Sequence, residues 1–246
     1  MSTTPLAAPH GWIILDKPLE LGSTQAVSAV KRNLRAAGYN MKLKGGVKVG
    51  HGGTLDPLAS GILPIALGEA TKLTGRMLDA SKVYEFTVRF GAQTDTLDLE
   101  GQVIATSEVR PIAAEVAAVL PQFTGPIAQV PPAYSALMVD GRRAYDLARA
   151  GHEVELAARN VTIHALDLID AGEDFATLRA HVSKGTYIRS LARDIALALG
   201  TRGFVTMLRR TQAGPFGLDQ AISLDKLNAI GQGAPLGTIL LPLEAG

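Results

Sequence analysis

The chain has 246 residues, of which 47% are hydrophobic and 19% are charged, and its formal net charge at pH 7 is +1. This length and balance are typical of a folded globular protein with a sizeable core, and they exclude a largely disordered chain. Because the chain contains no cysteine, disulfide bonds, thiolate metal sites and a cysteine nucleophile are excluded.

Residues 1–10 contain no basic region followed by an apolar segment, so no secretory signal is visible. No apolar run approaches the roughly 18 residues that a bilayer-spanning helix needs. We therefore expect a cytoplasmic protein that does not enter a membrane.

The predicted elements begin with a short strand over 11–15 that enters a turn at 16–18. Ser23 or Thr24 offers an N-cap for a helix that ends near Gly38. Its apolar stripe consists of Ala26, Val27, Val30 and Leu34. Basic side chains lie off this stripe, which predicts a helix with a basic outer face.

A glycine-rich stretch over 45–53 leads to an apolar strand over 62–67. Strict alternation of apolar and polar residues predicts a half-buried strand over 84–90. Pro111, at a first helical position, predicts a short helix that ends near Leu120.

The segment 129–151 is rich in proline, tyrosine and arginine and is interpreted as a loop with one helix. A hairpin follows, with strands over 161–169 and 175–183. The next helix has a buried stripe of Ile188, Leu191, Ile195 and Leu199, and Gly200 ends it. Strands and helices do not alternate regularly, so we expect an α+β fold with a mostly antiparallel sheet.

Basic residues gather in two segments. Every charged residue between 21 and 55 is basic, and Asp194 is the only acidic residue between 179 and 210. The basic residues are Lys31, Arg32, Arg35, Lys42, Lys44 and Lys48 in the first segment, and Arg179, Lys184, Arg189, Arg193, Arg202, Arg209 and Arg210 in the second. Such segments favour either one positive face for a polyanion or two separate solvated surfaces, and charge alone leaves both open.

Asp56 is the main candidate for chemistry. It lies between the glycine-rich stretch and Pro57, which restricts it to an extended conformation. A carboxylate held there could act as a nucleophile or a base. The alternative is a turn aspartate that binds its own backbone, which is common beside proline and glycine.

Arg189 and Tyr84 have comparable alternatives. Arg189, in the first turn of the last predicted helix, could hold a catalytic carboxylate ionised, grip a phosphate, or simply lie on the surface. Tyr84, on the core face of its strand, could stack on a base or serve as a core residue with its hydroxyl at the rim.

The glycine-rich stretch fits neither a Walker sequence nor the dinucleotide fingerprint. The five histidines show no metal-ligand spacing, so no metal site is expected. His164 and His181 fall in predicted strands and are interpreted as structural. His51 differs because it lies in the glycine-rich stretch close to Asp56, where it is either a surface loop residue or part of a site.

Five motifs, in this order and spacing, resemble the TruB family of tRNA pseudouridine synthases over nearly the whole chain. They are 11–18 with 22–24, 49–61 with 68–72, Tyr84 with 91–96, 129–136, and 183–191 with 208–210. The resemblance implies a pseudouridine synthase fold, with a central sheet flanked by helices and loops and a catalytic cleft across the sheet. The implied reaction isomerises uridine 55 in the T-loop of tRNA.

The resemblance also implies a role for each matching residue. Asp56 matches the catalytic aspartate and Arg189 the arginine that pairs with it. Tyr84 matches the tyrosine that stacks on the flipped base, and His51 the histidine that fills the space the nucleotide vacates. Further positions that line or support the pocket match Lys17, Lys72, Tyr187 and Leu208.

By the same resemblance the enzyme needs no cofactor or metal, binds the T-stem-loop of tRNA, and acts as a monomer without an obligatory protein partner. The implied organisation is a tail over 1–10, a catalytic domain over 11–240, and in 241–246 the start of a C-terminal segment. Relatives continue there into an RNA-binding module of PUA type, which we expect to be absent. Gly52 is a second departure, since many relatives carry threonine there.

Three other functions compete with a stand-alone enzyme. The first is a guide-RNA-dependent relative, the catalytic subunit of archaeal and eukaryotic ribonucleoproteins. The second is a tRNA-binding folding factor whose isomerase activity is incidental. The third is an RNA-binding domain with an inactive site, which intact Asp56, Tyr84 and Arg189 argue against.

Overall fold

The computed structural model describes residues 6–42, 45–135, 138–139, 142–144, 150 and 156–246. The chain divides into two compact units, residues 1–83 with 209–246 and residues 84–208. We call them the first and the second unit. The strands β4 (Lys82–Phe90) and β12 (Gly203–Ala213) contribute residues to both.

Strand β3 (Ser60–Leu67) is the centre of the first unit's sheet. It pairs antiparallel with β1 (Gly11–Lys17) and with β2 (Val49–His51), and parallel with the end of β12. β13 (Phe216–Gly217) pairs antiparallel with β12. β1 and β3 are buried almost throughout, which explains why their sequences are continuous apolar runs rather than alternating ones.

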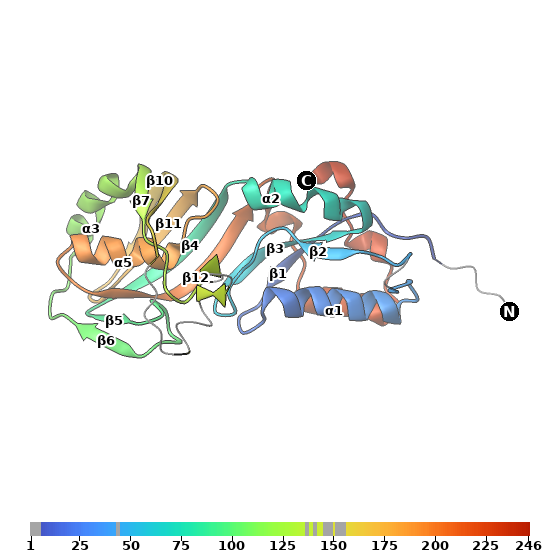
Figure 1. Ribbon diagram of the computed structural model, residues 1–246, viewed down its shortest axis with the longest axis horizontal. Helices are drawn as coiled ribbons and strands as arrows, with labels where there is room; N and C mark the ends of the chain where they lie inside the picture. Colours follow the sequence, from blue (N-terminus) through green and yellow to red (C-terminus); the bar gives the residue numbers. More distant parts are fainter. Residues whose placement is uncertain (1–5, 43–44, 136–137, 140–141, 145–149, 151–155) are drawn as a thin grey trace. The chain divides into compact units, whose positions relative to one another are not determined.

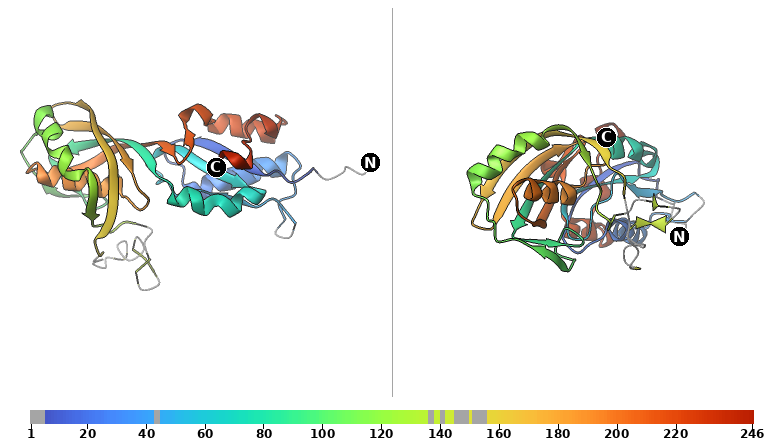
Figure 2. Two further views of the ribbon diagram at one scale, coloured as in Figure 1. Left: turned by 90° about the horizontal axis from the view of Figure 1, so that it is seen from above. Right: turned by 60° about the vertical axis from the view of Figure 1, so that its left-hand side comes forward.

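Two helices, α1 (Ser23–Ala36) and α6 (Leu224–Gly231), pack together over this sheet, and Figure 2 shows them side by side. The apolar stripe predicted for α1 is buried, and Lys31, Arg32 and Arg35 are exposed, as expected. No element was predicted for 224–231 or for β12. The remaining short helices of the unit are η1 (Gly68–Leu73), α2 (Thr74–Asp79), η3 (Leu218–Gln220), η4 (Leu236–Thr238) and η5 (Leu243–Ala245).

The predicted N-cap of α1 was wrong. Gly22 is the N-cap residue, and its backbone N–H donates to Oε1 of Gln25 at 2.7 Å. Ser23 is already helical, and its hydroxyl bonds to the backbone of Leu55 instead. A tertiary partner therefore took the hydroxyl that local sequence rules assigned to capping.

The second unit is built on the strand order β12-β4-β11-β10-β7. The predicted hairpin is confirmed as β10 (Arg159–Ala171) and β11 (Phe175–Val182), and β7 (Gly125–Gln129) extends it antiparallel. His164 and His181 lie in this hairpin, with ring centroids 4.8 Å apart. A smaller sheet pairs β5 (Ala92–Thr94) with β6 (Val103–Thr106).

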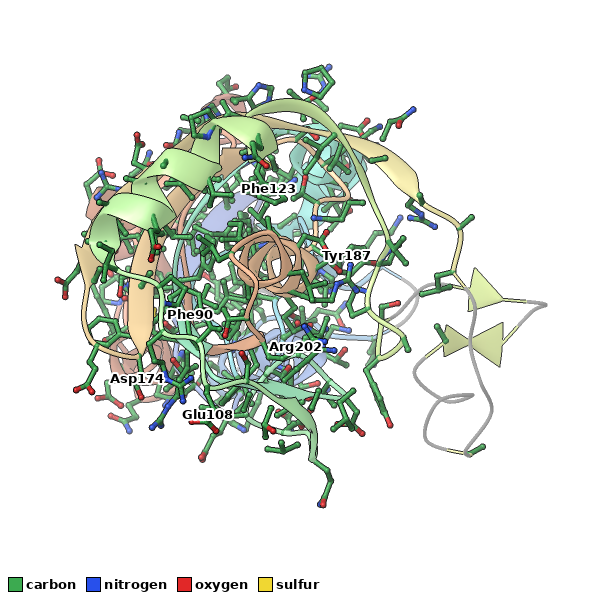
Figure 3. The ribbon with its side chains drawn as sticks, turned by 90° about the vertical axis from the view of Figure 1, so that its left-hand side faces the viewer. Phe90, Glu108, Phe123, Asp174, Tyr187 and Arg202 are labelled. Atoms are coloured by element: carbon green, nitrogen blue, oxygen red, sulfur yellow. The ribbon has the colours of Figure 1, made fainter. Side chains whose placement is uncertain are left out.

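Helices α3 (Ala113–Val119) and α5 (Ile188–Ala198) lie on one face of this sheet (Figure 1). Figure 3 looks along α5, with Phe90 and Phe123 on either side of it as parts of the core. Gly200 follows α5 with φ of +72°, as its predicted role in ending the helix requires. Apolar side chains of β4, β10, β11 and both helices fill this core.

Pro111 does not open a helix. The helix α3 begins at Ala113 with Ile112 as its N-cap, and the Glu115 side chain accepts the Ile112 N–H at 2.9 Å. A 3-10 turn, η2 (Leu120–Phe123), follows it. The helix predicted within 129–151 falls partly on residues outside the described part; β8 (Met138–Val139) and β9 (Arg142–Arg143) are described there.

The fold is the predicted α+β class, with a mostly antiparallel sheet flanked by helices. Among the described residues, no helix is both long and apolar enough to cross a membrane.

Candidate active site

The turn that carries Asp56 is held on both sides by bonds to its main chain. The Ser23 hydroxyl donates to the Leu55 carbonyl at 2.9 Å and accepts the Leu55 N–H at 2.8 Å. After Asp56, the Pro57 carbonyl accepts the N–H of Glu20 at 2.8 Å. Asp56 itself is half-buried. Fixed neighbours on each side restrict where its carboxylate can point, as a catalytic group requires.

Arg210, which sequence reasoning placed only in the second basic segment and at the end of the last motif, holds the segment just before Asp56. Its guanidinium donates to the carbonyls of Gly53 at 3.3 Å and Thr54 at 3.1 Å, and to that of Ile62 at 2.7 Å. The side chain is fully buried in the first unit. The only available signal was its place at the end of the last motif, in a strand that was not predicted.

Lys17 is fully buried at the end of β1. Its ammonium donates to the carbonyls of Leu21 at 2.6 Å and Pro18 at 2.9 Å, with a longer bond to Pro57 at 3.5 Å. Burial lowers the pKa of Lys17 to about 8, with Asp56 raising it and Arg210 lowering it further. The lysine thus supports the Asp56 turn from within the protein.

His51 ends β2 and is half-buried. Burial, and then the positive charge of Arg210, lower the pKa of its imidazole, which favours the neutral ring at pH 7. Its Nδ1 atom is buried without a hydrogen-bond partner among the described residues. The neighbouring Gly52 leaves no room for a side chain, because a Cβ there would lie 2.6 Å from Cβ of Met77.

The hydrogen bonds of Lys72 differ from those of the groups around Asp56. It is exposed on η1 and forms an ion pair with Glu69 one turn earlier. Among the described residues, no hydrogen bond links Lys72 to the Asp56 turn. Its expected place at the pocket stays a prediction.

In the second unit, Arg189 is not a surface arginine, because its side chain is only 10% exposed. Its guanidinium donates to the carbonyl of Thr96 at 2.9 Å and to that of Tyr134 at 3.0 Å. Asp98 forms an ion pair with it at 3.3 Å. Two segments of the unit, the loop that carries Thr96 and Asp98 and the segment at Tyr134, therefore hold the guanidinium in one orientation.

Asp98 was missed by sequence reasoning. One carboxylate oxygen accepts the Thr96 hydroxyl at 2.6 Å and the Glu100 N–H at 3.0 Å, which leaves the other to face Arg189. The Tyr134 hydroxyl in turn donates to Asp95 at 3.2 Å. The carboxylates of Asp95 and Asp98 thus organise the loop after β5. Their oxygen atoms accept hydrogen bonds from, or form an ion pair with, other residues of the second unit.

The other predicted residues of the second unit lie on its framework. Tyr84 and Leu208 are half-buried and pack against the core at β4 and β12. Tyr187, labelled beside α5 in Figure 3, is the N-cap residue of that helix, and its N–H donates to Oε1 of Gln129 at 2.8 Å.

The first unit therefore holds Asp56, His51 and Lys17, and the second holds Arg189 and Tyr84. Within the first unit these groups share one electrostatic environment around the Asp56 turn. The pairing of Asp56 with Arg189 stays a prediction. Among the described residues, no three His, Asp or Glu side chains gather in a group that could hold a metal ion.

The two basic segments differ in structure. In the first, Lys31, Arg32, Arg35, Lys42 and Lys48 are exposed. In the second, Arg202 and Arg210 donate to main-chain carbonyls, and the other four arginines form ion pairs with acidic residues. These four are Arg179 with Glu85, Arg189 with Asp98, Arg193 with Asp194, and Arg209 with Asp16. Most of that charge is thus compensated inside the fold.

Comparison with known proteins places the chain in a family. Residues 39–188 match the profile "TruB family pseudouridylate synthase (N terminal domain)", and residues 189–246 match "tRNA pseudouridylate synthase B C-terminal domain". The chain is 72% identical over 241 residues to tRNA pseudouridine synthase B of Novosphingobium aromaticivorans, covering 96% of this chain and 78% of that protein. Identity to tRNA pseudouridine synthase B of Zymomonas mobilis subsp. mobilis is 58%, covering 100% of this chain and 80% of that protein.

A solved structure of an H/ACA ribonucleoprotein bound to a substrate RNA containing 2'-deoxyuridine contains a similar chain, with a TM-score of 0.69 and 27% identity. The match covers 96% of this chain and 60% of that one. The family profiles together span both units of the fold. The chain therefore belongs to the TruB family of pseudouridine synthases.

Proposed function

We propose that this chain converts uridine 55 in the T-loop of tRNA to pseudouridine, with Asp56 as the catalytic carboxylate. The observation that carries the proposal is the turn over 53–57, in which bonds from Ser23 and Arg210 fix the main chain before Asp56 and the Glu20 N–H fixes it after. The names of the similar bacterial proteins support tRNA as the substrate.

Asp56 attacks the ribose or the base, or assists cleavage of the glycosidic bond. The N1–C1′ bond breaks, the freed uracil rotates and C5 bonds to C1′; C5 then loses its proton and N1 takes one up, so the isomer has the composition of the substrate. In each of these variants, a carboxylate must meet the nucleotide at a defined angle. A turn whose flanking carbonyls are all bonded satisfies this requirement without reorganisation during the reaction.

The target uridine is buried in the folded T-loop, so it must be extruded at a cost of a few kcal/mol. Stacking on Tyr84 offsets roughly 1–3 kcal/mol of that cost. His51 enters the space that the nucleotide vacates. A neutral imidazole suits this role, and burial and Arg210 both lower its pKa.

Arg189 pairs with Asp56 and keeps it ionised, in a cleft across the sheet that Lys17, Lys72, Tyr187 and Leu208 line or support. What supports this is that Arg189 is already oriented by Asp98 and two carbonyls in its own unit. A guanidinium fork holds several acceptors at once, so bonds to Thr96 and Tyr134 are compatible with a carboxylate partner.

The enzyme acts as a cytoplasmic monomer on the T-stem-loop, and the exposed cations of α1 bind its phosphates. The reaction uses no cofactor or metal. The guide-RNA-dependent function is disfavoured because identity to the ribonucleoprotein chain is 27%, against 72% to a bacterial tRNA pseudouridine synthase B.

The test is to incubate the chain with a T-stem-loop RNA, without added metal, and to map pseudouridine. The wild-type chain should modify position 55, and Asp56→Asn should bind the RNA without modifying it. Asp170→Asn, which changes an exposed aspartate near the end of β10 in the second unit, is the control and should retain activity. Near-wild-type turnover by Asp56→Asn would remove Asp56 from its role.

The same assay separates the other functions. A wild-type chain that binds tRNA and promotes its folding, but forms no pseudouridine, would support an RNA-binding protein with an inactive site. Modification that requires an added guide RNA would support the ribonucleoprotein function.

A further inference from the structure

Arg210 is a buried cation whose bonding pattern is unusual for an arginine. The exposed fraction of Arg210 is only 1%. All of its hydrogen bonds within the described part of the chain end on main-chain carbonyls, those of Gly53, Thr54 and Ile62. Burying a cation without a counter-ion is costly unless its donors are satisfied. A cost of this kind is retained where the geometry serves a purpose.

The carbonyls that Arg210 binds bracket the Asp56 turn. Two precede Asp56 by two and three residues, and the third lies in β3, which follows the turn. One rigid guanidinium therefore ties the start of the turn to the strand that receives it. Asp56 lies inside the loop that this side chain closes.

Two glycines of the same motif accommodate Arg210. At Gly61, where φ is +103°, a Cβ would lie 2.1 Å from the backbone oxygen of Arg210, so glycine allows β12 to run beside β3. At Gly53, where φ is +129°, a Cβ position lies 3.8 Å from Nη1 of Arg210. Glycine permits this backbone conformation beside the guanidinium.

Only arginine satisfies all three acceptors together. Its planar fork presents donors from Nε and from both terminal nitrogens in fixed directions. All three nitrogens are used, with Nε on Ile62, Nη1 on Thr54 and Nη2 on Gly53. A lysine ammonium has the same charge but a single nitrogen, which cannot reach acceptors on both sides of the turn.

We propose that Arg210 is a positioning residue for the reaction, which acts by closing the main chain of the Asp56 turn onto β3 and so fixing the carboxylate. This inference rests on the proposed function of Asp56. It assigns Arg210 a role beyond charge.

The experiment is single-turnover modification of a T-stem-loop RNA by Arg210→Lys, which keeps the charge and loses the fork. We expect the rate constant to fall about 100-fold, as for a reacting group displaced by about 1 Å, while the Kd for the RNA keeps its wild-type value. Asn33→Ala is the stability control: it removes two bonds of a buried side chain between α1 and α6, away from the turn. It should lower thermal stability without lowering the rate constant.

NMR titration of His51 gives a readout that a general loss of stability would not produce. Because Arg210 lowers the pKa of His51, Arg210→Gln should raise that pKa and Arg210→Lys should leave it low. Both variants should nevertheless lose the rate, since neither has the fork. Arg210→Gln also provides the rate comparison if Arg210→Lys does not fold.

The outcomes are distinct. If wild-type enzyme is active and Arg210→Lys or Arg210→Gln reacts at the same rate, the positioning role is wrong. If the rate falls only in proportion to the folded fraction, as in Asn33→Ala, Arg210 serves stability alone and the inference is also wrong. If the wild-type chain itself forms no pseudouridine, the proposed function is wrong, and the inference about Arg210, which rests on it, is wrong with it.

Discussion

The hydroxyl of Ser23 donates to the carbonyl of Leu55 at 2.9 Å and accepts the N–H of Leu55 at 2.8 Å. These two bonds satisfy the backbone groups of Leu55, as a neighbouring strand would in a sheet. Both residues are buried. Leu55 is the residue before Asp56, and Ser23 is the first residue of α1. The helix start is thereby joined to the Asp56 turn through a single side chain.

Ser23→Ala should destabilise the protein and slow modification. The change leaves a buried N–H and a buried carbonyl of Leu55 without this partner, at a cost of about 1–3 kcal/mol. Urea denaturation measures the loss, and single-turnover assays at a temperature where the variant is folded measure the rate. Ser28→Ala, on the exposed side of the same helix, should change stability by about 0.5 kcal/mol or less. Equal effects of the two variants would contradict the role of Ser23.

Asp98→Ala should destabilise the second unit by more than the loss of a single surface charge would. The carboxylate accepts from Thr96 and Glu100 and faces Arg189, so its removal leaves a nearly buried guanidinium without its counter-ion. Breaking such a pair costs about 3–5 kcal/mol. We expect a lower melting temperature and, in folded enzyme, slower modification with unchanged RNA affinity.

The control for Asp98 is Asp194→Ala on α5, which breaks a more exposed ion pair with Arg193. Exposed pairs contribute about 0–1 kcal/mol, so this variant should remain stable and active. Loss of activity in both variants to the same degree would show that α5 tolerates no change, rather than that Asp98 orients Arg189.

The buried ammonium of Lys17 predicts a stability change with pH. Burial lowers its pKa from 10.5 to about 8 in the folded protein. Between these values the unfolded chain holds a proton that the folded chain has released, so the free energy of unfolding rises with pH, by at most about 3 kcal/mol. Well below pH 8 both states are protonated and this contribution is constant.

Denaturation of wild-type protein and Lys17→Met at pH 7.5 and pH 10 tests this. The wild-type protein should gain stability relative to Lys17→Met over this interval. A parallel response of the two proteins would show that Lys17 titrates normally. NMR observation of the Lys17 ammonium provides the direct measurement.

Salt dependence should come mainly from α1. Lys31, Arg32 and Arg35 are exposed there, whereas Arg179 and Arg193 are engaged with Glu85 and Asp194. Replacing the three α1 cations with glutamine should reduce the slope of log Kd against log salt concentration by about 2–3.

Arg179→Gln and Arg193→Gln serve as matched charge controls and should leave that slope nearly unchanged. If they flatten it as strongly as the α1 variant, the ion pairs open on RNA binding and the second basic segment also contacts phosphates. If no variant changes the slope, neither segment is the RNA-binding face.

By itself, the sequence determined several local elements and the family resemblance. Alternation over 84–90 predicted β4, and the apolar stripes predicted α1 and α5, because side-chain burial repeats with the period of each element. The hairpin of β10 and β11 followed from its turn residues. The five motifs identified the family and singled out Asp56.

Only the tertiary structure decided what holds Asp56 in place. Ser23, predicted as a helix cap, bonds to Leu55 instead, and Arg210, which lies 156 positions after Thr54, binds its carbonyl. Any residue can supply a backbone carbonyl or N–H, so bonds from side chains to a distant main chain leave no pattern in the sequence. The turn could thus be singled out from its residues, whereas its rigidity depends on which strands the fold brings beside it.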